Sequence, residues 1–241
     1  MKKHTLLIAL IALAAACYSA SPAECSENAV QGVPVSSFVQ EPPVTDTMSL
    51  TLDLGSKAQA GQLAIADVLT YNGANPTITP PAGWTLIRDD SSPTTRQSLY
   101  WHAVEVNDPS TQDWIFSEPV DAQGVVLLLD DVAETNPVDA SSGNTGHSGT
   151  LTANSAATAS NEDFIIALYA TDFGGAGPGH DMPKNMSTIV DQQETPLDYW
   201  ILATNQSNYG DNGQATTVTP QLFNWVAAQV AFKSATAAAA R

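Results

Sequence analysis

One short string in the chain has the residue types of a nucleophilic active site. Gly146-His147-Ser148-Gly149-Thr150 follows the Gly-x-Ser-x-Gly elbow of serine hydrolases, except that Thr150 replaces the last glycine. An elbow needs a strand before the serine and a helix after it, because that turn exposes the hydroxyl at the sheet edge. Here a Ser/Gly/Asn-rich linker precedes the string and a polar β-like run follows. We therefore expect an ordinary loop between two units and name no catalytic residue.

Histidine and aspartate are the residues that could bind a metal ion. The chain has four histidines, and no two of them have the spacing of zinc ligands. Aspartates occur in short clusters that offer oxygen ligands to Ca²⁺, but none has the spacing of a known calcium loop. The clusters are Asp89-Asp90, Asp130-Asp131 and Tyr209-Gly210-Asp211-Asn212-Gly213. We expect turns at these places, and the sequence indicates no cofactor.

The aromatic residues divide into two groups. All five tryptophans lie in strand-like runs, so core packing is the expected role. Tyr71, Phe173 and Tyr209 instead occur among glycines and asparagines, where an exposed ring would suit a sugar or a surface partner. Packing over the base of a loop is the alternative for each ring. The candidate binding residues are Tyr71, Asn72, Phe173, His180, Asp181 and Tyr209.

The N-terminal residues have the pattern of an export signal. Lys2 and Lys3 precede an apolar run at 6–16, which is too short to cross a bilayer as a helix. A signal peptide at 1–23 would be cut after Ala23. Alternatively, Ala14-Ala15-Ala16-Cys17 resembles a bacterial lipobox, in which Cys17 would carry the lipid anchor. Either way we expect an exported protein, free or at the cell surface.

Beyond the signal, the chain begins with a polar segment and is strongly acidic. Residues 24–45 mix Ser, Pro and Val, which predicts an extended leader rather than a packed element. Six of the eight basic residues remain after loss of Lys2 and Lys3, against 25 acidic ones, for a net charge of −19. Such a surface repels phosphate backbones and anionic headgroups, which argues against nucleic-acid and direct membrane binding.

The hydrophobic pattern indicates strands throughout the remaining chain. From Thr47 on, Met48, Leu50, Leu52 and Leu54 alternate with polar residues, which is the period of a half-buried strand. Similar short runs follow one another with Gly, Pro and Asn between them, and no amphipathic helix interrupts them. This succession predicts an all-β sandwich.

The strand pattern occurs twice, about a hundred residues apart. Leu50 corresponds to Leu151 and Leu63 to Phe164, both at an offset of 101. Pro81-x-x-Trp84-Thr85-x-Ile87-x-Asp89 corresponds to Pro183-x-x-Met186-Ser187-x-Ile189-x-Asp191 at 102, Tyr100-Trp101 to Tyr199-Trp200 at 99, and Val125 to Val226 at 101. Offsets this steady predict a duplicated β unit.

These patterns define the expected domain organisation. We predict one jelly-roll-like β-sandwich over residues 46–234, built from pseudo-repeated halves at 46–132 and 147–234, with a frayed tail at 235–241. Two tandem immunoglobulin-like sandwiches are the alternative. The single sandwich is favoured because the linker at 134–149 contains no long flexible spacer, and because one closed sandwich exposes fewer strand edges.

One stretch resembles a known module. Thr79-Pro80-Pro81-Ala82-Gly83-Trp84-Thr85-Leu86-Ile87, preceded by Gly61-Gln62-Leu63-Ala64-Ile65-Ala66, is similar to the "TPPAGW" β-sandwich module of bacterial secreted and phage-related proteins. Asn136-Pro137-Val138-Asp139-Ala140 and the ending at 226–232 match its linker and closing strand. The resemblance spans about 47–234. It implies the sandwich fold and an extracellular module, but no settled activity, and the chain departs from it at 174–179 and 182–185.

Three functions are compatible with these observations. The leading hypothesis is an exported, non-catalytic binding or surface module that recognises a glycan or another cell-surface ligand. One alternative is an extracellular polymer hydrolase that uses paired carboxylates, although the sequence singles out no pair. The other is a structural subunit of a cell-surface assembly.

Overall fold

The computed structural model describes residues 23–25, 34–71, 75–172, 181–183, 185–194 and 197–235. Every element in these ranges is a β-strand, and neighbouring strands within each sheet are antiparallel. The same residues include no helix that is long and apolar enough to cross a membrane. The predicted all-β class is confirmed.

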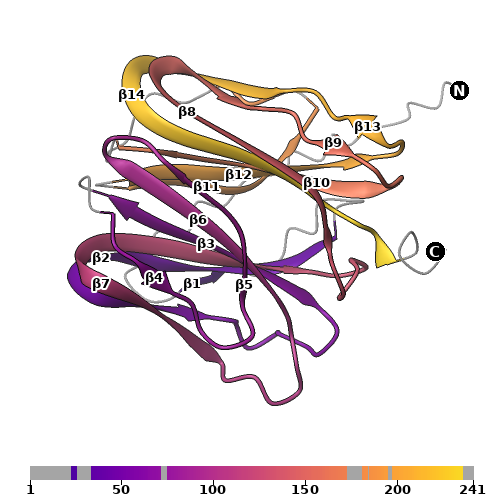
Figure 1. Ribbon diagram of the computed structural model, residues 1–241, viewed down its shortest axis with the longest axis horizontal. Coiled ribbons are helices and arrows are strands. Elements are labelled where there is room, and N and C mark those ends of the chain that lie inside the picture. Colours follow the sequence, from indigo (N-terminus) through magenta and orange to yellow (C-terminus); the bar gives the residue numbers. More distant parts are fainter. Residues whose placement is uncertain are drawn as a thin grey trace, which may run out of the picture.

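The first sheet comes entirely from the first half of the chain (Figure 1). In spatial order its main strands are β2 (Val35–Asp53), β7 (Thr111–Leu129), β3 (Leu63–Tyr71), β6 (Thr95–Ala103) and β5 (Thr85–Ser91). Two short strands complete it, because β1 (Ala23–Cys25) pairs with β2, and β4 (Ile78–Thr79) pairs with β7.

The second sheet comes entirely from the second half. Its order is β8 (Val138–Ala153), β14 (Ala215–Phe232), β10 (Asp163–Thr171), β12 (Leu197–Gln206) and β11 (Ser187–Glu194). A two-stranded ribbon of β9 (Ala157–Thr158) and β13 (Gly210–Asp211) accompanies it. When the five main strands of each half are numbered by their order in the chain, their spatial order across the sheet is first, fifth, second, fourth, third. The two halves therefore share one topology, as the sequence repeat predicts.

The two sheets pack face to face and share one core. Leu63, Ile65 and Leu69 of β3 lie in the same buried cluster as Ile166 and Leu168 of β10. Both central strands are buried along their whole length, as expected for the middle of a sheet that is covered on both sides. The predicted sandwich of two repeated halves is confirmed. Each sheet is contiguous in sequence, which is simpler than the interleaved strands of a jelly roll, and the shared core excludes two separate tandem sandwiches.

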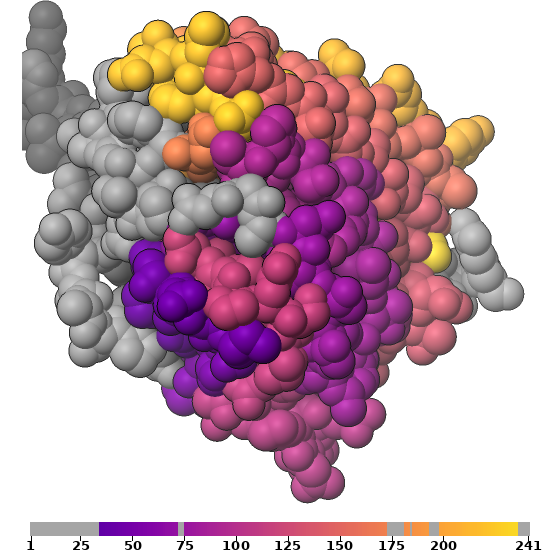
Figure 2. Space-filling view, turned by 60° about the vertical axis from the view of Figure 1, so that its left-hand side comes forward, coloured from indigo at the N-terminus to yellow at the C-terminus, as the bar shows by residue number. Residues whose placement is uncertain are grey.

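Each half also buries the outer face of its own sheet. The long strands β2 and β7, and likewise β8 and β14, curl so that their far ends lie over the sheet they belong to (Figure 1). In the first half this packs Leu50 and Trp114 against Ala64. In the second it packs Leu151 and Ala215 against Ala167. Figure 2 shows one face of the molecule, on which the indigo-to-magenta surface of the first half adjoins the salmon-to-yellow surface of the second.

Strand register corrects two of the landmark pairs proposed from the sequence repeat. Trp101 lies opposite Ile65, and the residue opposite the equivalent Ile166 is Ala203, at an offset of 203 − 101 = 102. Trp200 is therefore not the counterpart of Trp101. The same comparison moves the counterpart of Val125 from Val226 to Ala228. Aromatic residues occur at nearby positions in both halves without occupying the same place in the sheet.

Two predicted boundaries are wrong. The leader expected at 24–45 enters the sheet, because β2 begins at Val35 and the side chains of Val35 and Val39 are buried. The register of β2 shifts between Glu41 and Val44, which accommodates the prolines that suggested a leader. The linker expected at 134–149 contains most of β8, so the second half starts earlier than 147. The signal segment up to residue 22, including Cys17, and the tail from 236 lie outside the described residues.

Candidate functional site

A cavity of about 220 Å³ opens on the outer face of the second sheet. Ile165, Thr204 and Gln229 belong to this face, because their neighbours in β10, β12 and β14 point into the shared core. Amide side chains dominate the lining. The lining residues are Ile165, Asn185, Met186, Thr204, Asn205, Gln206, Asp211, Asn212, Gly213, Gln214, Ala215 and Gln229.

The cavity has a fixed frame built from two amides. The Nε2 of Gln229 donates to the carbonyl oxygens of Ala153 (3.1 Å) and Gly213 (3.0 Å). Its Oε1 accepts from the Nδ2 of Asn212 at 2.9 Å, and the Oδ1 of Asn212 accepts from the N–H of Ala156 at 2.8 Å. Each polar atom of the two side chains therefore has a protein partner. The pair joins β14 to the loop that walls the cavity.

A third amide of the lining, Gln206, has an acceptor without a partner. Gln206 donates through Nε2 to the carbonyls of Asn208 (2.8 Å) and Gly210 (3.3 Å), which fixes the loop after β12. Its Oε1 is buried and has no hydrogen-bond partner among the described residues. A buried acceptor without a partner costs free energy, and Gln206 is the described lining residue that carries one.

The loop between Gln206 and Asp211 carries an exposed aromatic ring. The Tyr209 side chain is 69 % exposed, while its N–H donates to the Oδ1 of Asn161 at 2.9 Å. The N–H of the next residue, Gly210, donates to the hydroxyl of Thr158 at 3.1 Å. The loop is therefore held by its main chain, and the ring is presented to solvent without a packing role.

One charged group borders the cavity. The hydroxyl of Ser155 and the N–H of Gly213 both donate to Asp211, and they hold the pKa of this carboxyl below its usual value. Asp211 is therefore an anion at neutral pH. Among the residues that the structure describes, no lysine or arginine lines the cavity. A neutral or cationic ligand would be accepted here more readily than an anion.

The other residues predicted from sequence lie elsewhere or outside the described ranges. Tyr71 is the last residue of β3 and is 2 % exposed in the shared core, so its prediction as an exposed binding residue is wrong. Asp181 is exposed and bridges to Val218 through its main chain. Among the candidates that the structure describes, only Tyr209 lies on the loop between the lining residues Gln206 and Asp211, and it is not itself a lining residue. Asn72, Phe173 and His180 fall outside the described residues.

The Gly-His-Ser-Gly string lies within β8 and not in a loop as predicted. The Ser148 hydroxyl accepts the indole N–H of Trp225 at 3.0 Å and donates to the carbonyl of Thr150 at 2.6 Å. The Nδ1 of His147 contacts the Oδ1 of Asn224 at 3.1 Å. The strand–turn–helix geometry of a nucleophile elbow is therefore not formed at this string.

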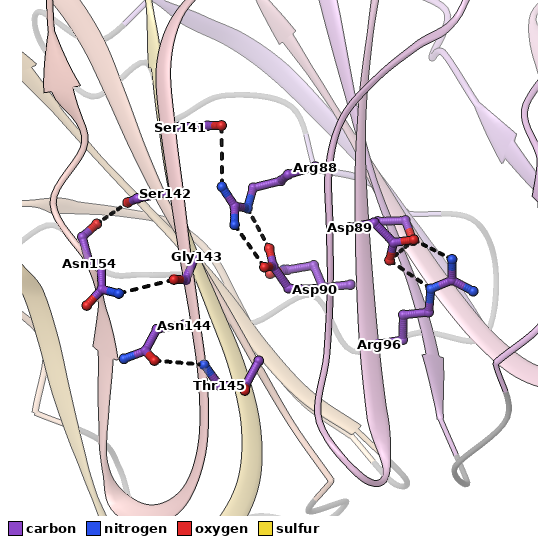
Figure 3. Close-up of polar contacts among 12 residues, drawn as sticks. Arg88, Asp89, Asp90, Arg96, Ser141, Ser142, Gly143, Asn144, Thr145 and Asn154 are labelled. Atoms are coloured by element: carbon purple, nitrogen blue, oxygen red, sulfur yellow. Dashed lines mark hydrogen bonds and ion pairs between the residues drawn. The ribbon is translucent and has the colours of Figure 1, made fainter.

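Arginines neutralise one of the acidic clusters considered for calcium. Arg88 forms a two-pronged ion pair with Asp90, with Nη2 to Oδ1 at 2.8 Å, and its Nη1 reaches the Ser141 hydroxyl of β8 (Figure 3). Arg96 pairs with Asp89 in the same manner. Among the described residues, no group of three or more His, Cys, Asp and Glu side chains could hold a metal ion.

The segment that resembles the TPPAGW module forms a turn fastened to β6. His102 contacts the carbonyl oxygen of Gly83 through Nδ1 (3.1 Å) and the Oδ2 of Asp108 through Nε2 (2.7 Å). The Trp84 ring stacks on the imidazole, with centroids 5.3 Å apart. Gly83 has a φ of +87°, which explains a glycine at this position. These contacts give the segment a structural role.

Sequence reasoning missed the amides of the cavity. Gln206, Asn212 and Gln229 come from three separate stretches, and only the fold brings them together. One signal was present, because Gln229 interrupts the otherwise apolar run at 226–232. Comparison of the chain with protein-family models, curated proteins and solved structures finds no match.

Proposed function

We propose that the protein is an exported binding module that takes one neutral, hydroxyl-rich unit, such as a sugar residue of a surface polymer, into the amide-lined cavity. The buried, unpartnered Oε1 of Gln206, one of the residues that line the cavity, is the observation that carries the proposal. The exposed ring of Tyr209 on the same loop supports it, because aromatic faces pack against the apolar faces of sugars while amides bond to their hydroxyls.

The chemistry of the lining favours this class of ligand. An amide side chain offers both donors and an acceptor, and a hydroxyl group needs both. The volume of about 220 Å³ is below the range of roughly 300–1,000 Å³ typical of sites for drug-sized ligands. A single small polar unit fits that size, with the rest of a polymer chain lying outside.

The electrostatics point the same way. Asp211 is the charged residue of the lining, and the whole chain has a net charge of −17. Phosphorylated or sulfated ligands would be repelled from such a site. Among surface polymers, neutral glycans are therefore expected to bind in preference to anionic ones.

Binding assays on neutral and anionic polysaccharides test this function. The protein is screened against both, and the dissociation constant of a positive neutral ligand is then measured by calorimetry for three variants. Thr204→Val removes a hydroxyl from the lining while keeping its volume, and Tyr209→Ala removes the exposed ring. Gln221→Ala, an exposed residue of β14 outside the lining, is the control.

We expect Thr204→Val and Tyr209→Ala each to weaken binding about tenfold, the loss of roughly one hydrogen bond or one ring contact. Gln221→Ala should bind as the wild type does. Equal affinities for all four proteins, or binding of anionic polymers alone, would contradict the proposal.

A carboxylate pair gives the hydrolase alternative a concrete form. Asp191 of β11 and Asp198 of β12 lie on neighbouring strands, where Asp198 pairs with Gln193 and Asp191 pairs with Trp200. Burial, and then repulsion by Asp191, raise the pKa of Asp198 to about 7. A carboxylic acid that keeps its proton near neutral pH is suited to general acid catalysis. Loss of polymer cleavage in Asp198→Asn, with polymer binding retained, would favour this second function.

A further inference from the structure

Three polar side chains lie inside the core that the two sheets share. Asp67 of β3, Gln97 of β6 and Gln123 of β7 are 1 %, 0 % and 0 % exposed. Gln97 and Gln123 flank Leu69, and Leu69 belongs to the core cluster between the sheets. The Nε2 of Gln97 donates to the Oδ2 of Asp67 at 2.9 Å. The group therefore faces the second sheet and not the solvent.

Most polar atoms of this group have no partner among the described residues. They are the Oδ1 of Asp67, the Oε1 of Gln97 and both amide atoms of Gln123. Buried polar groups are nearly always satisfied, and an unpaired buried charge is far more costly than an unpaired neutral group. The environment therefore favours the neutral form of Asp67 strongly over the carboxylate.

The duplication supplies an internal control for this group. By strand register, the counterparts of Asp67, Gln97 and Gln123 in the second half are Leu168, Tyr199 and Val226. All three counterparts lie in the same shared core. The second half therefore forms the same sheet topology with Leu168, and not a buried carboxyl, at the position of Asp67. Packing alone does not require Asp67.

Within the described part of the chain, no cation that faces Asp67 compensates its charge. On the neighbouring edge strand, Arg88 and Asp90 point toward the same side of the sheet, but they are joined to each other (Figure 3). The other titratable groups of the facing elements are Tyr71 of β3, Asp121 of β7, Tyr199 of β12 and Asp172 at the end of β10, which accepts from Thr94. The core residues of β10 and β14 that face the group are apolar. Ionisation would place an uncompensated negative charge between the sheets.

We propose that Asp67 is a proton-operated lock between the two sheets, closed while its carboxyl is neutral and opened when the carboxyl loses its proton. In the closed form the neutral acid occupies the shared core beside Gln97. In the open form the charge draws water between the sheets, along the side where β5 meets β8. The protein is therefore held most firmly in an acidic medium.

The direction of the pH effect follows from proton linkage. Burial raises the pKa of Asp67 from 3.8 to about 7, against a smaller lowering by Gln97. Between these values the folded chain holds a proton that the unfolded chain has released, so stability falls as pH rises through this window. A difference of about three pKa units corresponds to a decrease of about a thousandfold in the folding equilibrium constant.

The test compares urea unfolding at pH values from about 4 to 8 for the wild type and three variants. Asp67→Asn keeps the shape without the titration, and Asp67→Leu introduces the residue found in the second half. Asp113→Asn, which changes an exposed carboxylate of β7, is the control. We expect both Asp67 variants to show a much flatter pH profile than the wild type and Asp113→Asn.

Two further measurements use only the wild type, so they do not depend on whether a variant folds. The carboxyl carbon of Asp67 in the wild type, followed by NMR, should titrate near neutral pH. Amide hydrogen exchange in β3 and β10, corrected for the intrinsic rate, should accelerate as this group ionises. A carboxyl that titrates near its ordinary value, exchange that is independent of that titration, or identical pH profiles for wild type and Asp67→Leu would overturn the proposal.

Discussion

Ile87 and Ile189 are each the extra residue of a β-bulge in an edge strand, and they stand 102 positions apart. β5 slips by one residue against β6 between Leu86 and Arg88, and β11 slips against β12 between Thr188 and Val190. Bulges of this kind bend an edge strand and make it a poor template for pairing with another chain. The two halves therefore share an irregularity as well as a topology, which is strong support for duplication.

A close contact in the second half predicts the effect of adding one methyl group. A Cβ at Gly146 would stand 2.5 Å from Cζ2 of the Trp225 ring. Trp225 is 4 % exposed, and its indole N–H donates a hydrogen bond to the Ser148 hydroxyl. Because the ring is rigid, Gly146→Ala should lower the free energy of unfolding by about 1–3 kcal/mol. Thr145→Ala, at an exposed neighbouring position, is the control. Equal stability of the two variants in urea unfolding would contradict this contact.

The turn beside His102 gives a second prediction. Both ring nitrogens face oxygen acceptors, on Gly83 and Asp108, so the imidazole donates to both when it carries two protons. His102→Ala should cost about 2 kcal/mol of unfolding free energy, since one of the two bonds is to a charged group. His147→Ala, an exposed histidine, should change stability by less than about 0.5 kcal/mol. Comparable losses for the two histidines would show that the turn is not held in this way.

Strand periodicity was enough to predict the sandwich and the repeat, but not the edges of the elements. β8 was not predicted as a strand because its Ser, Gly and Asn residues are typical of loops. It is a strand because it pairs with β14 along most of its length. Tyr71 was misplaced because glycine and asparagine follow it, although it is the last inward-facing residue of β3. Composition near a strand end therefore describes the loop and not the strand residue before it.

The candidate site was predictable only in part. Tyr209 was identified because an aromatic residue in a Gly/Asn-rich loop has little to pack against, and its ring is indeed exposed. The lining of the cavity depends on strand order, which brings Gln229 of β14 beside the loop around Asn212. That contact joins residues that no periodic pattern relates. The unpartnered acceptor of Gln206 follows from burial, which the sequence does not specify.

A third prediction concerns the second buried carboxyl. Asp198 has its pKa raised to about 7, first by burial and then by the negative charge of Asp191. The folded chain therefore keeps a proton that the unfolded chain releases above pH 3.8, and the corresponding stability is lost as pH rises toward 7. Asp198→Asn should flatten this part of the pH profile of unfolding. Asp191→Asn should flatten it less, because it removes only the smaller cause.

The variants of Asp198 and Asp191 can contradict the assignment of burial as the main cause of the raised pKa of Asp198. A profile unchanged in Asp198→Asn, or one altered more by Asp191→Asn than by Asp198→Asn, would contradict the assignment of burial as the main cause. Asp198 alternates with Tyr199 of the shared core and therefore faces the outer side of the second sheet, whereas Asp67 faces the shared core. Their effects on unfolding free energy should therefore add in the double variant.

The central claim is that a neutral, hydroxyl-rich ligand occupies the cavity on the outer face of the second sheet. The most direct measurement is an NMR titration of the labelled protein with the neutral oligosaccharide that binds best in the polysaccharide screen. We predict amide shift changes concentrated in Thr204, Gln206, Tyr209 and the wall at 211–214. Changes confined to the first sheet, or no saturable change with any neutral glycan, would contradict the claim.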